Sequence, residues 1–370
     1  MSPELPRTEV VVDLAAIRHN VRLLAERAAG AATMAVVKAD GYGHGAVPVA
    51  KAALEAGATW LGACSLAEGL ALREAGITAP VFTWLDVPGT DFEPGVAADI
   101  DLSASSGEEL ARIVDAAQRA GKRARVHLKI DTGLSRSGAP AYAWPALVKA
   151  AAAEPDIEVV AIWSHLACAD EPGHPSIDLQ AQRFQEAYDV AREAGLNPLR
   201  HLANSAATLT RPDLHFDLVR PGIAIYGLNP VPQQEDLRPA MTFRSQVVLT
   251  KRISAGESVS YGQTWTAERD TTLALVPAGY ADGVPRTLSG RMDVWLGGRR
   301  RPVAGRVCMD QLVVDCGDDE PEAGAEVVLF GAGVAGEPTA REWADTIGTI
   351  DYEIVTGMYR PRVRRRYEGE

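Results

Sequence analysis

The sequence predicts an α/β fold in which a (β/α)8 barrel, residues 1–240, is followed by a mainly β-stranded domain, residues 241–370. Three observations support this division. Runs of β-forming residues alternate with helical patterns in the first part of the chain, the pattern changes after Pro239, and 370 residues are many for one hydrophobic core. Strands alternating with helices are typical of a parallel sheet, and eight such repeats favour a closed barrel over an open sheet.

Eight segments of the barrel region are rich in residues that favour strands. They are 34–38, 60–65, 81–85, 99–103, 125–131, 158–166, 200–204 and 216–222. Between them, Ser65 and Ser106 are each followed three residues later by glutamate, which predicts capping boxes at the starts of two helices. In a barrel of this kind the functional side chains lie at the carboxyl ends of the strands.

The second domain is predicted from Met241 onward, where short β-rich runs are separated by Gly and Asp turns. One clear helix is expected there, near residues 339–347. The N-terminal segment, about residues 8–14, precedes the first barrel helix and is expected to pair with this domain as a strand.

Composition excludes several classes of function. The net charge of −12 argues against nucleic acid or an anionic membrane as partner, because both require a basic face. The one basic run, residues 360–366, is interpreted as a solvated strand or tail. No apolar stretch is long enough to span a bilayer and the N-terminus lacks a signal-peptide core, so a cytoplasmic location is expected.

The cysteines and histidines argue against a metal site. The four cysteines, at positions 64, 168, 308 and 316, have no metal-binding or redox spacing and are expected to be reduced, mostly buried thiols. The seven histidines likewise form no pattern of metal ligands in the sequence. No metal is expected.

The segment 34–45, MAVVKADGYGHG, is the most informative part of the chain. An apolar run ends in Lys38, and glycines then alternate with Tyr42 and His44, so that the backbone can turn sharply and approach a ligand closely. A partly desolvated lysine at a strand end has a lowered amine pKa and can act as a nucleophile. The alternative is an ordinary lysine at the rim of the core.

Other predicted strand ends carry residues whose side chains or backbone groups could bind a ligand. Arg136 offers a planar fork suited to a carboxylate, although it and Lys129 could be surface charges. His165 could be a structural hydrogen-bond partner, the commoner role of a lone histidine. Ser205 can offer its hydroxyl and amide to a phosphate, and the backbone N–H groups of Gly222 and Ile223 follow strand eight, where barrels often bind phosphate.

Several motifs in this order resemble the alanine racemase family, which uses pyridoxal phosphate. The resemblance extends over nearly the whole chain, from residues 11–14 and Asn20 to Tyr352. The segments that carry it are MAVVKADGYGHG at 34–45, KIDTGLSRSG at 129–138, VRPGIAIYG at 219–227, SYG at 260–262, GYADG at 279–283, GRVCMDQ at 305–311 and DYE at 351–353.

The resemblance implies roles for residues of the barrel. Lys38 would bind the cofactor covalently, Tyr42 would hold its phosphate and His165 would lie beside its ring. The implied cofactor-binding set is Lys38, Tyr42, Trp84, His165, Asn204, Ser205, Arg220, Gly222, Ile223 and Tyr352. Arg136 would bind the substrate carboxylate, held by Lys129, which is carbamylated in many members, and Ser135 stands where the family usually has glycine.

Arg220 is the most telling of these residues, because the resemblance places it against the pyridine nitrogen. Most pyridoxal-phosphate enzymes place a carboxylate there, which keeps that nitrogen protonated and the ring strongly electron-withdrawing. An arginine cannot accept a proton, so it leaves the nitrogen neutral and weakens the withdrawal. In the family this is thought to limit side reactions.

The second domain contributes residues that would otherwise be taken for turns with packed aromatic side chains. The resemblance implies that Tyr261 of the partner subunit is the second catalytic base and that the Met309 amide helps bind the substrate carboxylate. Tyr352 would form an inner gate as well as contact the phosphate. The implied entrance residues are Asp170, Tyr280, Arg286, Arg306, Asp310 and Ile350.

The implied function is the interconversion of L- and D-alanine by a homodimer with shared active sites, supplying D-alanine for peptidoglycan. Removing the α-proton from one face and returning it to the other requires two bases, for which Lys38 and Tyr261 are the candidates. The alternatives are a broad-specificity or serine-tolerant racemase, a pyridoxal-phosphate decarboxylase, and a non-catalytic cofactor carrier. Arg220 disfavours the decarboxylase, and the β domain with Tyr261 disfavours the one-domain carrier.

Overall fold

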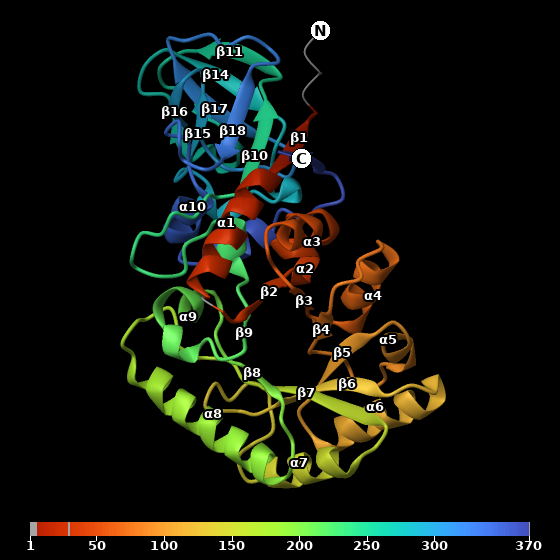
Figure 1. The fold of residues 1–370 in the computed structure, drawn as a ribbon. Helices are drawn as coiled ribbons and strands as arrows, with labels where there is room; N and C mark the ends of the chain where they lie inside the picture. The colour runs from red at the N-terminus through yellow and green to blue at the C-terminus, as the bar shows by residue number, and fades with distance from the viewer. Residues whose placement is uncertain (1–5, 29, 370) are drawn as a thin grey trace. The chain divides into compact units, whose positions relative to one another are not determined.

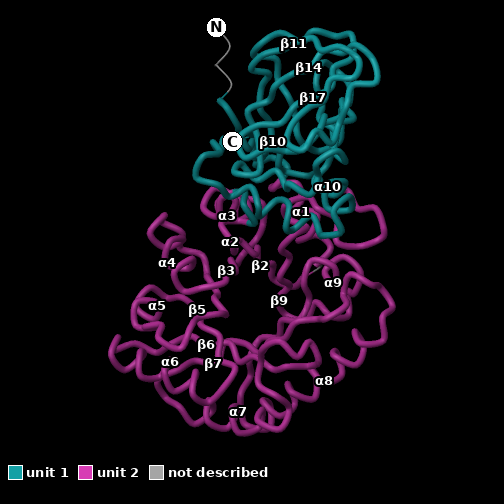
Figure 2. The backbone as a smooth tube through the Cα atoms, turned by 180° about the vertical axis from the view of Figure 1, so that it is seen from behind, with its two compact units in different colours: residues 1–16, 42–44, 238–370 teal, residues 17–41, 45–237 magenta. Residues whose placement is uncertain are grey.

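The computed structural model describes residues 6–28 and 30–369. Its contacts divide the chain into two compact units, coloured separately in Figure 2. Unit 1 comprises Met1–Ala16, Tyr42–His44 and Arg238–Glu370, and unit 2 comprises Ile17–Gly41 and Gly45–Leu237. The outermost ends of the two predicted domains, residues 1–5 and 370, lie outside the described residues.

Unit 2 contains an eight-stranded parallel sheet, as predicted. The strands are β2 (Ala32–Val36), β3 (Trp60–Ala63), β4 (Val81–Thr83), β5 (Ile100–Ala104), β6 (Ala124–Lys129), β7 (Ile157–Trp163), β8 (Leu199–His201) and β9 (Leu218–Val219). They follow the order β8-β7-β6-β5-β4-β3-β2-β9. The sheet closes between its two outer strands, where the Asp217 N–H donates to the Arg200 carbonyl (3.2 Å) and the Arg220 N–H to the Ala203 carbonyl (2.9 Å). The barrel prediction is confirmed.

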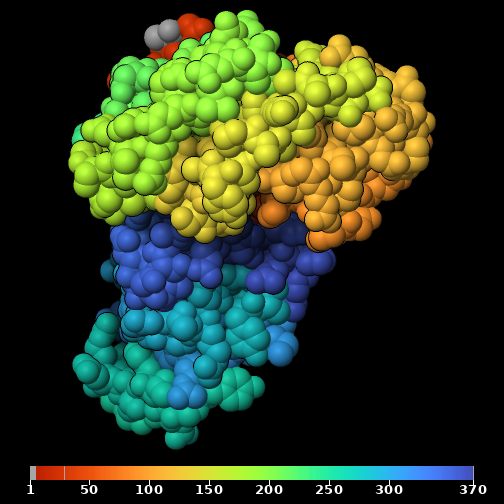
Figure 3. Space-filling view, turned by 90° about the horizontal axis from the view of Figure 1, so that it is seen from below, coloured from red at the N-terminus to blue at the C-terminus, as the bar shows by residue number. Residues whose placement is uncertain are grey.

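Helices follow the strands and cover the outside of the barrel (Figure 1). They are α2 (Lys38–Tyr42), α3 (Ala46–Glu55), α4 (Leu66–Glu74), α5 (Glu93–Ala97), α6 (Gly107–Ala120), α7 (Trp144–Ala153), α8 (Pro175–Glu193) and α9 (Ser205–Thr210), preceded by α1 (Leu14–Arg27). In Figure 3 the surface of this unit runs from orange through yellow to green, so successive segments cover neighbouring parts of it. Short 3-10 turns, η1 (Pro212–Leu214) and η2 (Ile223–Tyr226), flank β9.

One of the two predicted capping boxes is complete. At α4, Ser65 Oγ accepts from the Glu68 N–H (3.3 Å) and the Glu68 carboxylate accepts from the Ser65 N–H (3.4 Å). At α6, Ser106 Oγ accepts from the Glu109 N–H (3.1 Å), but the Glu109 carboxylate binds the N–H of Ser105 instead of that of Ser106 (2.7 Å). The second box was therefore only half right, because the chain before α6 presents an earlier N–H group to the glutamate.

Unit 1 is mainly β-stranded. Its strands are β1 (Thr8–Asp13), β10 (Met241–Gln246), β11 (Leu249–Ile253), β12 (Ser258–Val259), β13 (Trp265–Thr266), β14 (Thr271–Val276), β15 (Asp293–Leu296), β16 (Arg299–Pro302), β17 (Leu312–Gly317), β18 (Glu326–Phe330) and β19 (Arg364–Glu368). They form a six-stranded sheet in the order β16-β15-β18-β10-β1-β19, a three-stranded sheet β11-β14-β17 and the pair β12-β13.

The N-terminal strand β1 lies inside the six-stranded sheet. It pairs antiparallel with β10 and parallel with β19, near the other end of the chain. Glu9 on β1 is buried and accepts from Arg244 NH2 on β10 (2.6 Å), while Arg364 Nε on β19 lies 3.6 Å from its other oxygen. The basic run at 360–366 is therefore partly a paired strand, whose charges help to neutralise a buried carboxylate.

Among its described residues, unit 1 has one more α-helix than the sequence predicted. Besides α10 (Ala340–Ile347), which begins with a complete Thr339 capping box, α11 spans Asp351–Thr356. The residue before it, Ile350, makes no side-chain cap, so the sequence carried no start signal. Three 3-10 turns, η3 (Tyr261–Gln263), η4 (Tyr280–Asp282) and η5 (Arg286–Leu288), connect the strands.

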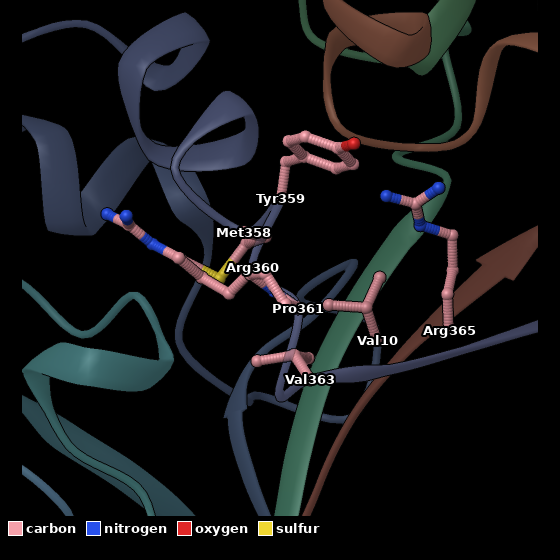
Figure 4. A pocket seen from close by; sticks show the side chains of 7 residues that line it. All are labelled: Val10, Met358, Tyr359, Arg360, Pro361, Val363 and Arg365. Atoms are coloured by element: carbon pink, nitrogen blue, oxygen red, sulfur yellow. The ribbon is translucent and has the colours of Figure 1, made fainter.

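A cavity of about 280 Å³ lies in unit 1 beside β1 (Figure 4). The guanidinium of Arg365 lies 5.6 Å from the ring centre of Tyr359 at this cavity. None of the residues lining it belongs to the predicted site; they are Val10, Met358, Tyr359, Arg360, Pro361, Val363 and Arg365.

All four cysteines are free, but only Cys316 is fully buried, so the expectation of mostly buried thiols was wrong. Among the helices of the described chain, none combines the length and apolar character that crossing a bilayer requires.

Candidate active site

Lys38 stands where β2 leaves the barrel core, two positions beyond the last strand residue, Val36. The chain then makes a left-handed turn, with positive φ at Ala39 (52°), Asp40 (50°), Gly41 (62°) and Tyr42 (51°). For the three non-glycine residues this conformation costs about 1–2 kcal/mol each. Lys38 therefore lies beside a strained backbone segment, which other contacts must maintain.

Hydrogen bonds on both sides maintain this turn. The Gly41 N–H donates to the Val37 carbonyl (2.8 Å), and the Gly45 N–H donates to the Asp40 carbonyl (2.8 Å). The Asp40 carboxylate accepts from the first N–H of α3, that of Ala46 (2.9 Å). Glu68 on α4 accepts from the Ala39 N–H (2.8 Å), directly after the lysine. The residues around Lys38 are thus fixed by α3 and α4.

The ammonium group of Lys38 lies in a mixed environment. Burial lowers its pKa; Cys64 and Glu68 oppose this shift, whereas Arg136 and Arg220 add to it. Its Nζ lies 5.9 Å from the ring centre of Trp84 on the β4 side. A lowered amine pKa favours the neutral, nucleophilic form, as the sequence predicted.

Lys129 is the last residue of β6 and is buried, whereas Arg136 lies on the segment after β6 and is exposed. The Lys129 amine donates to Ser137 Oγ (2.5 Å) and lies 4.0 Å from the ring centre of Trp163. Burial, with Arg220 and Arg136 nearby, lowers its pKa to about 8. Arg136 forms no hydrogen bond or ion pair with any described residue, so its guanidinium is available to a ligand. Ser135 before it has φ +56°, a conformation that suits glycine.

Arg220 follows β9 and is almost completely buried. Its NH2 donates to the Ser164 carbonyl (2.7 Å) and to His165 Nδ1 (3.3 Å), and its NH1 donates to His201 Nδ1 (3.0 Å). Burial lowers the guanidinium pKa to about 9, so the group stays protonated at neutral pH. Among the described residues no carboxylate pairs with it, and its Nε has no hydrogen-bond partner.

The imidazole of His165 is kept uncharged by burial and by the cations around it. Burial lowers its pKa well below the ordinary value, and the positive charges of Arg220 and Arg136 lower it further. The structure thus brings His165 and Arg220 together, two residues that the resemblance places beside the cofactor ring.

Backbone N–H groups converge on Ser205 at the start of α9. Ser205 Oγ accepts from the Gly222 N–H (2.8 Å) and the Ala224 N–H (3.3 Å), and Ile223 is buried between them. Asn204 is the N-cap, because its side chain accepts from the Ala207 N–H (3.1 Å). Asp170, predicted at the entrance, is exposed on the segment after β7.

The predicted residues of unit 1 are more exposed. Tyr261 at the start of η3 is 72% exposed, after Ser260 with φ +67°. Arg306 lies against the turn, since a Cβ on Gly262 would lie 3.2 Å from its guanidinium carbon. The remaining members differ in their surroundings: Met309, Ile350, Asp310 and Arg286 are exposed, and Tyr280 is partly so.

Two further contacts order these loops. The Tyr280 N–H donates to the Cys308 carbonyl (3.0 Å), and Asp310 pairs with Arg362 (2.8 Å). The ring of Tyr42 lies 6.2 Å from that of Tyr352 on α11, so these two predicted phosphate ligands lie together.

Sequence reasoning missed residues that contact this site. Glu68 was recognised only as a capping residue, and His127 and His201, which continue the contacts of Arg220, were not singled out. The alternation of the strand carried a signal, because His127 precedes Lys129 by two residues and therefore faces the same side.

Comparison with known proteins settles the family. The N-terminal domain model of alanine racemase matches residues 12–230, and its C-terminal domain model matches residues 240–367. The chain belongs to the alanine racemase family. The alanine racemase of Salinispora arenicola is 58% identical over 369 residues, covering 98% of this chain and 99% of that one.

Solved structures of alanine racemases have the same fold. The enzyme from D-cycloserine-producing Streptomyces lavendulae has a TM-score of 0.96 at 50% identity, covering 99% of this chain and 98% of that one. The alanine racemase of Bartonella henselae, solved with covalently bound pyridoxal phosphate, has a TM-score of 0.89 at 29% identity, covering 98% and 99%.

The barrel residues fit pyridoxal phosphate by their chemistry. A half-buried lysine of lowered pKa suits covalent attachment, and the Ser205 hydroxyl with the N–H groups beside it suits a phosphate. The unpartnered Nε of Arg220 is a donor for a ring nitrogen, which would accept from it without being protonated.

Proposed function

We propose that the protein interconverts L- and D-alanine and that it does so with pyridoxal phosphate bound to Lys38. The observation that carries this proposal is the presence of a half-buried lysine of lowered pKa together with an arginine that has no carboxylate partner among the described residues. The cofactor, when bound, withdraws electrons from the substrate α-carbon and makes its proton removable. Arg220 keeps that withdrawal moderate, which favours proton exchange over decarboxylation.

The proposed binding of the cofactor uses residues of several strand ends. Lys38 provides the covalent bond and Arg220 Nε donates to the ring nitrogen. Ser205 with the N–H groups of Gly222 and Ile223 binds the phosphate together with Tyr42 and Tyr352. Trp84, His165 and Asn204 complete the proposed surroundings of the ring.

The substrate carboxylate is the proposed partner of Arg136, whose guanidinium is unpaired within the described chain. The Met309 N–H is the proposed second donor. Carbamylation would give Lys129 a negative charge that pairs with Arg136, and its pKa of about 8 makes the neutral amine needed for that reaction accessible.

Proton transfer requires one base on each face of the substrate. Lys38 is the proposed base on one face and Tyr261 of the partner subunit that on the other. The exposure of Tyr261 supports this assignment, because a catalytic tyrosine needs an environment that its own unit does not supply. The proposed dimer therefore has two shared sites.

Selection of a small substrate is assigned to the entrance. Asp170, Tyr280, Arg286, Arg306, Asp310 and Ile350 are its proposed residues, with Tyr352 as the inner gate. The proposed role is the supply of D-alanine for peptidoglycan in the cytoplasm.

Incubation with L-alanine in deuterium oxide tests the function. The racemase should yield D-alanine with deuterium at the α-carbon. Release of carbon dioxide would indicate a decarboxylase, and an unchanged substrate with a bound cofactor would indicate a carrier. Equal turnover of larger amino acids would replace alanine by a broad substrate class.

A further inference from the structure

A hydrogen-bonded chain crosses the buried interior of the barrel behind Arg220. Arg220 NH1 lies 3.0 Å from His201 Nδ1, His201 Nε2 lies 2.9 Å from His127 Nδ1, and His127 Nε2 lies 3.0 Å from Asp101 Oδ2. His127, His201 and Asp101 have no exposed surface. They come from β6, β8 and β5, so the hydrogen-bonded chain joins two neighbouring strands, β5 and β6, to β8, which is separated from β6 by β7.

The chemistry of the two ends gives this chain a direction. A guanidinium only donates, so His201 Nδ1 accepts and its proton lies on Nε2. His201 Nε2–H then donates to His127 Nδ1, which places the second proton on His127 Nε2. His127 Nε2–H donates to Asp101, which as a carboxylate only accepts. Every link is satisfied with both rings neutral and in the same tautomer.

The surroundings favour this one arrangement. Burial lowers the pKa of both histidines, and the positive charge of Arg220 lowers them further, so the rings stay neutral. Burial acts to raise the Asp101 pKa, but the contacts with His127 and Arg125 outweigh it and the pKa is lowered, which keeps the carboxylate charged. The charges at both ends of the hydrogen-bonded chain, on Arg220 and on Asp101, are therefore fixed.

Aromatic rings hold the two imidazoles in plane. The Phe82 ring lies 4.2 Å from the His127 ring at an angle of 16°. The Trp163 ring is parallel to that of His201 within 2°, at 5.8 Å. Ring rotation that would exchange the two nitrogens requires these stacks to separate, so the direction of the hydrogen bonds is built into the packing.

We propose that Asp101 is a positioning residue for the reaction: through the fixed tautomers of His127 and His201 it orients Arg220, so that Nε remains the donor that faces the cofactor ring. Asp101 touches neither substrate nor cofactor. This proposal rests on the function proposed above. In this proposal Asp101 on β5 controls the orientation of Arg220, which follows β9.

The ring tautomers can be observed directly in the holoenzyme. Nitrogen-15 NMR of histidine-labelled protein distinguishes protonated from unprotonated ring nitrogens, and His127→Gln and His201→Gln identify the two signals. We expect both rings to be neutral, with the proton on Nε2. A charged ring, or a proton on Nδ1 in either histidine, would overturn the proposal whether or not the Asp101 variant folds.

The variant Asp101→Asn removes the charge and keeps the size of the side chain. We expect the His127 signal to shift toward a mixture of tautomers and kcat to fall by roughly 10-fold in both directions, with KM nearly unchanged. The cofactor absorption should change as well, because the Arg220 donor is displaced. A folded variant with unchanged tautomers, spectrum and kcat would contradict the proposal.

Arg125→Gln is the matched control. Arg125 Nε donates to Asp101 Oδ1 (2.6 Å) and its NH2 donates to Oδ2 (3.2 Å), the oxygen that also accepts from His127, but Arg125 is not a link between Asp101 and Arg220. This variant should keep the histidine signals and kcat of the unaltered protein. If it reproduces the Asp101→Asn losses, the ion pair and not the chain is responsible, and the proposal fails. Absence of racemisation by the unaltered protein would instead refute the proposed function, whatever the NMR spectrum shows.

Discussion

The candidate residues of the barrel and those of the β-stranded unit differ in how they are held. Lys129 and Arg220 are 5% and 6% exposed, and each has partners from its own unit. Tyr261 and Met309 are 72% and 52% exposed. The barrel residues can therefore keep their geometry and altered pKa values in a single chain. Tyr261 and Met309 lack such buried surroundings within their own unit, as expected if a second copy of the chain supplies them.

The largest expected effect is on the barrel side. Lys38→Ala should lower racemisation by roughly 100- to 10,000-fold, because it removes both the cofactor bond and one base. The measurement is the rate of D-alanine formation, with borohydride labelling and peptide mass analysis of the unaltered protein. Lys51→Ala, which removes an exposed lysine of α3, should keep full activity and labelling. Label on Lys129 would overturn the assignment.

Mixed dimers test whether the Lys38 and the Tyr261 of one active site come from different chains. Lys38→Ala and Tyr261→Phe proteins, each nearly inactive, are unfolded together and refolded. Random pairing makes about half of the dimers mixed, each with one intact site, so about a quarter of the activity should return. Each parent refolded alone is the control. A mixture that stays inactive although mixed dimers form would place Tyr261 in the site of its own chain.

Tyr352 tests the gate in the β-stranded unit. Tyr352→Ala should raise the ratio of serine to alanine turnover by about 10-fold. Serine has one more side-chain atom than alanine, and one additional substrate atom in a tight pocket changes relative turnover by about that factor. Tyr142→Ala, at a tyrosine that is 89% exposed in the barrel unit, should leave the ratio unchanged. An unaltered ratio in the first variant would remove Tyr352 from the gate.

The protonation of the buried Lys129 amine can be followed as a function of pH. Its folded pKa of about 8 lies below the ordinary value of 10.5, so the neutral amine increases as the pH rises through about 8. Labelled bicarbonate should therefore give a carbamate carbon-13 signal that is stronger at about pH 8.5 than at about pH 7. The signal should be absent in Lys129→Arg. A signal that persists in this variant would assign the carbamate to another amine.

The smallest effect is expected at Ser135, beside Arg136. Ser135→Gly relieves the positive φ but adds freedom to the unfolded chain, so a gain of about 1 kcal/mol or less in the free energy of unfolding is expected. Ser254→Gly, at an exposed serine outside the group with positive φ, should lower stability slightly. Denaturant unfolding measures both. A loss at Ser135 as large as at Ser254 would contradict the strain argument.

The sequence was sufficient to predict the barrel and the approximate positions of its strands, because strand composition, capping residues and turn residues are local signals, but several strands end two or three residues before their predicted ends. It was not sufficient for the turn after Lys38, since Ala39 and Tyr42 are residue types that disfavour positive φ. That conformation depends on Glu68 and Asp40, whose contacts form only in the folded chain.

The chain behind Arg220 lay beyond sequence reasoning for another reason. His127 and Asp101 are on adjacent strands, but His201 is on β8, which is separated from β6 by β7, and only the assembled sheet sets the distance between the two histidines. The helix α11 was missed because it begins after Ile350 with no capping side chain. Each of these features depends on tertiary contacts that no local pattern encodes.

The position of β1 has a consequence for synthesis on the ribosome. The strand β1 leaves the ribosome long before its two neighbours, β10, which begins at Met241, and β19, which begins at Arg364. The contiguous barrel strands can assemble while translation continues, whereas β1 must wait for almost the whole polypeptide. Until then its unpaired edge is open to other nascent chains. Chaperone binding is therefore expected to concentrate on residues 8–13 during translation.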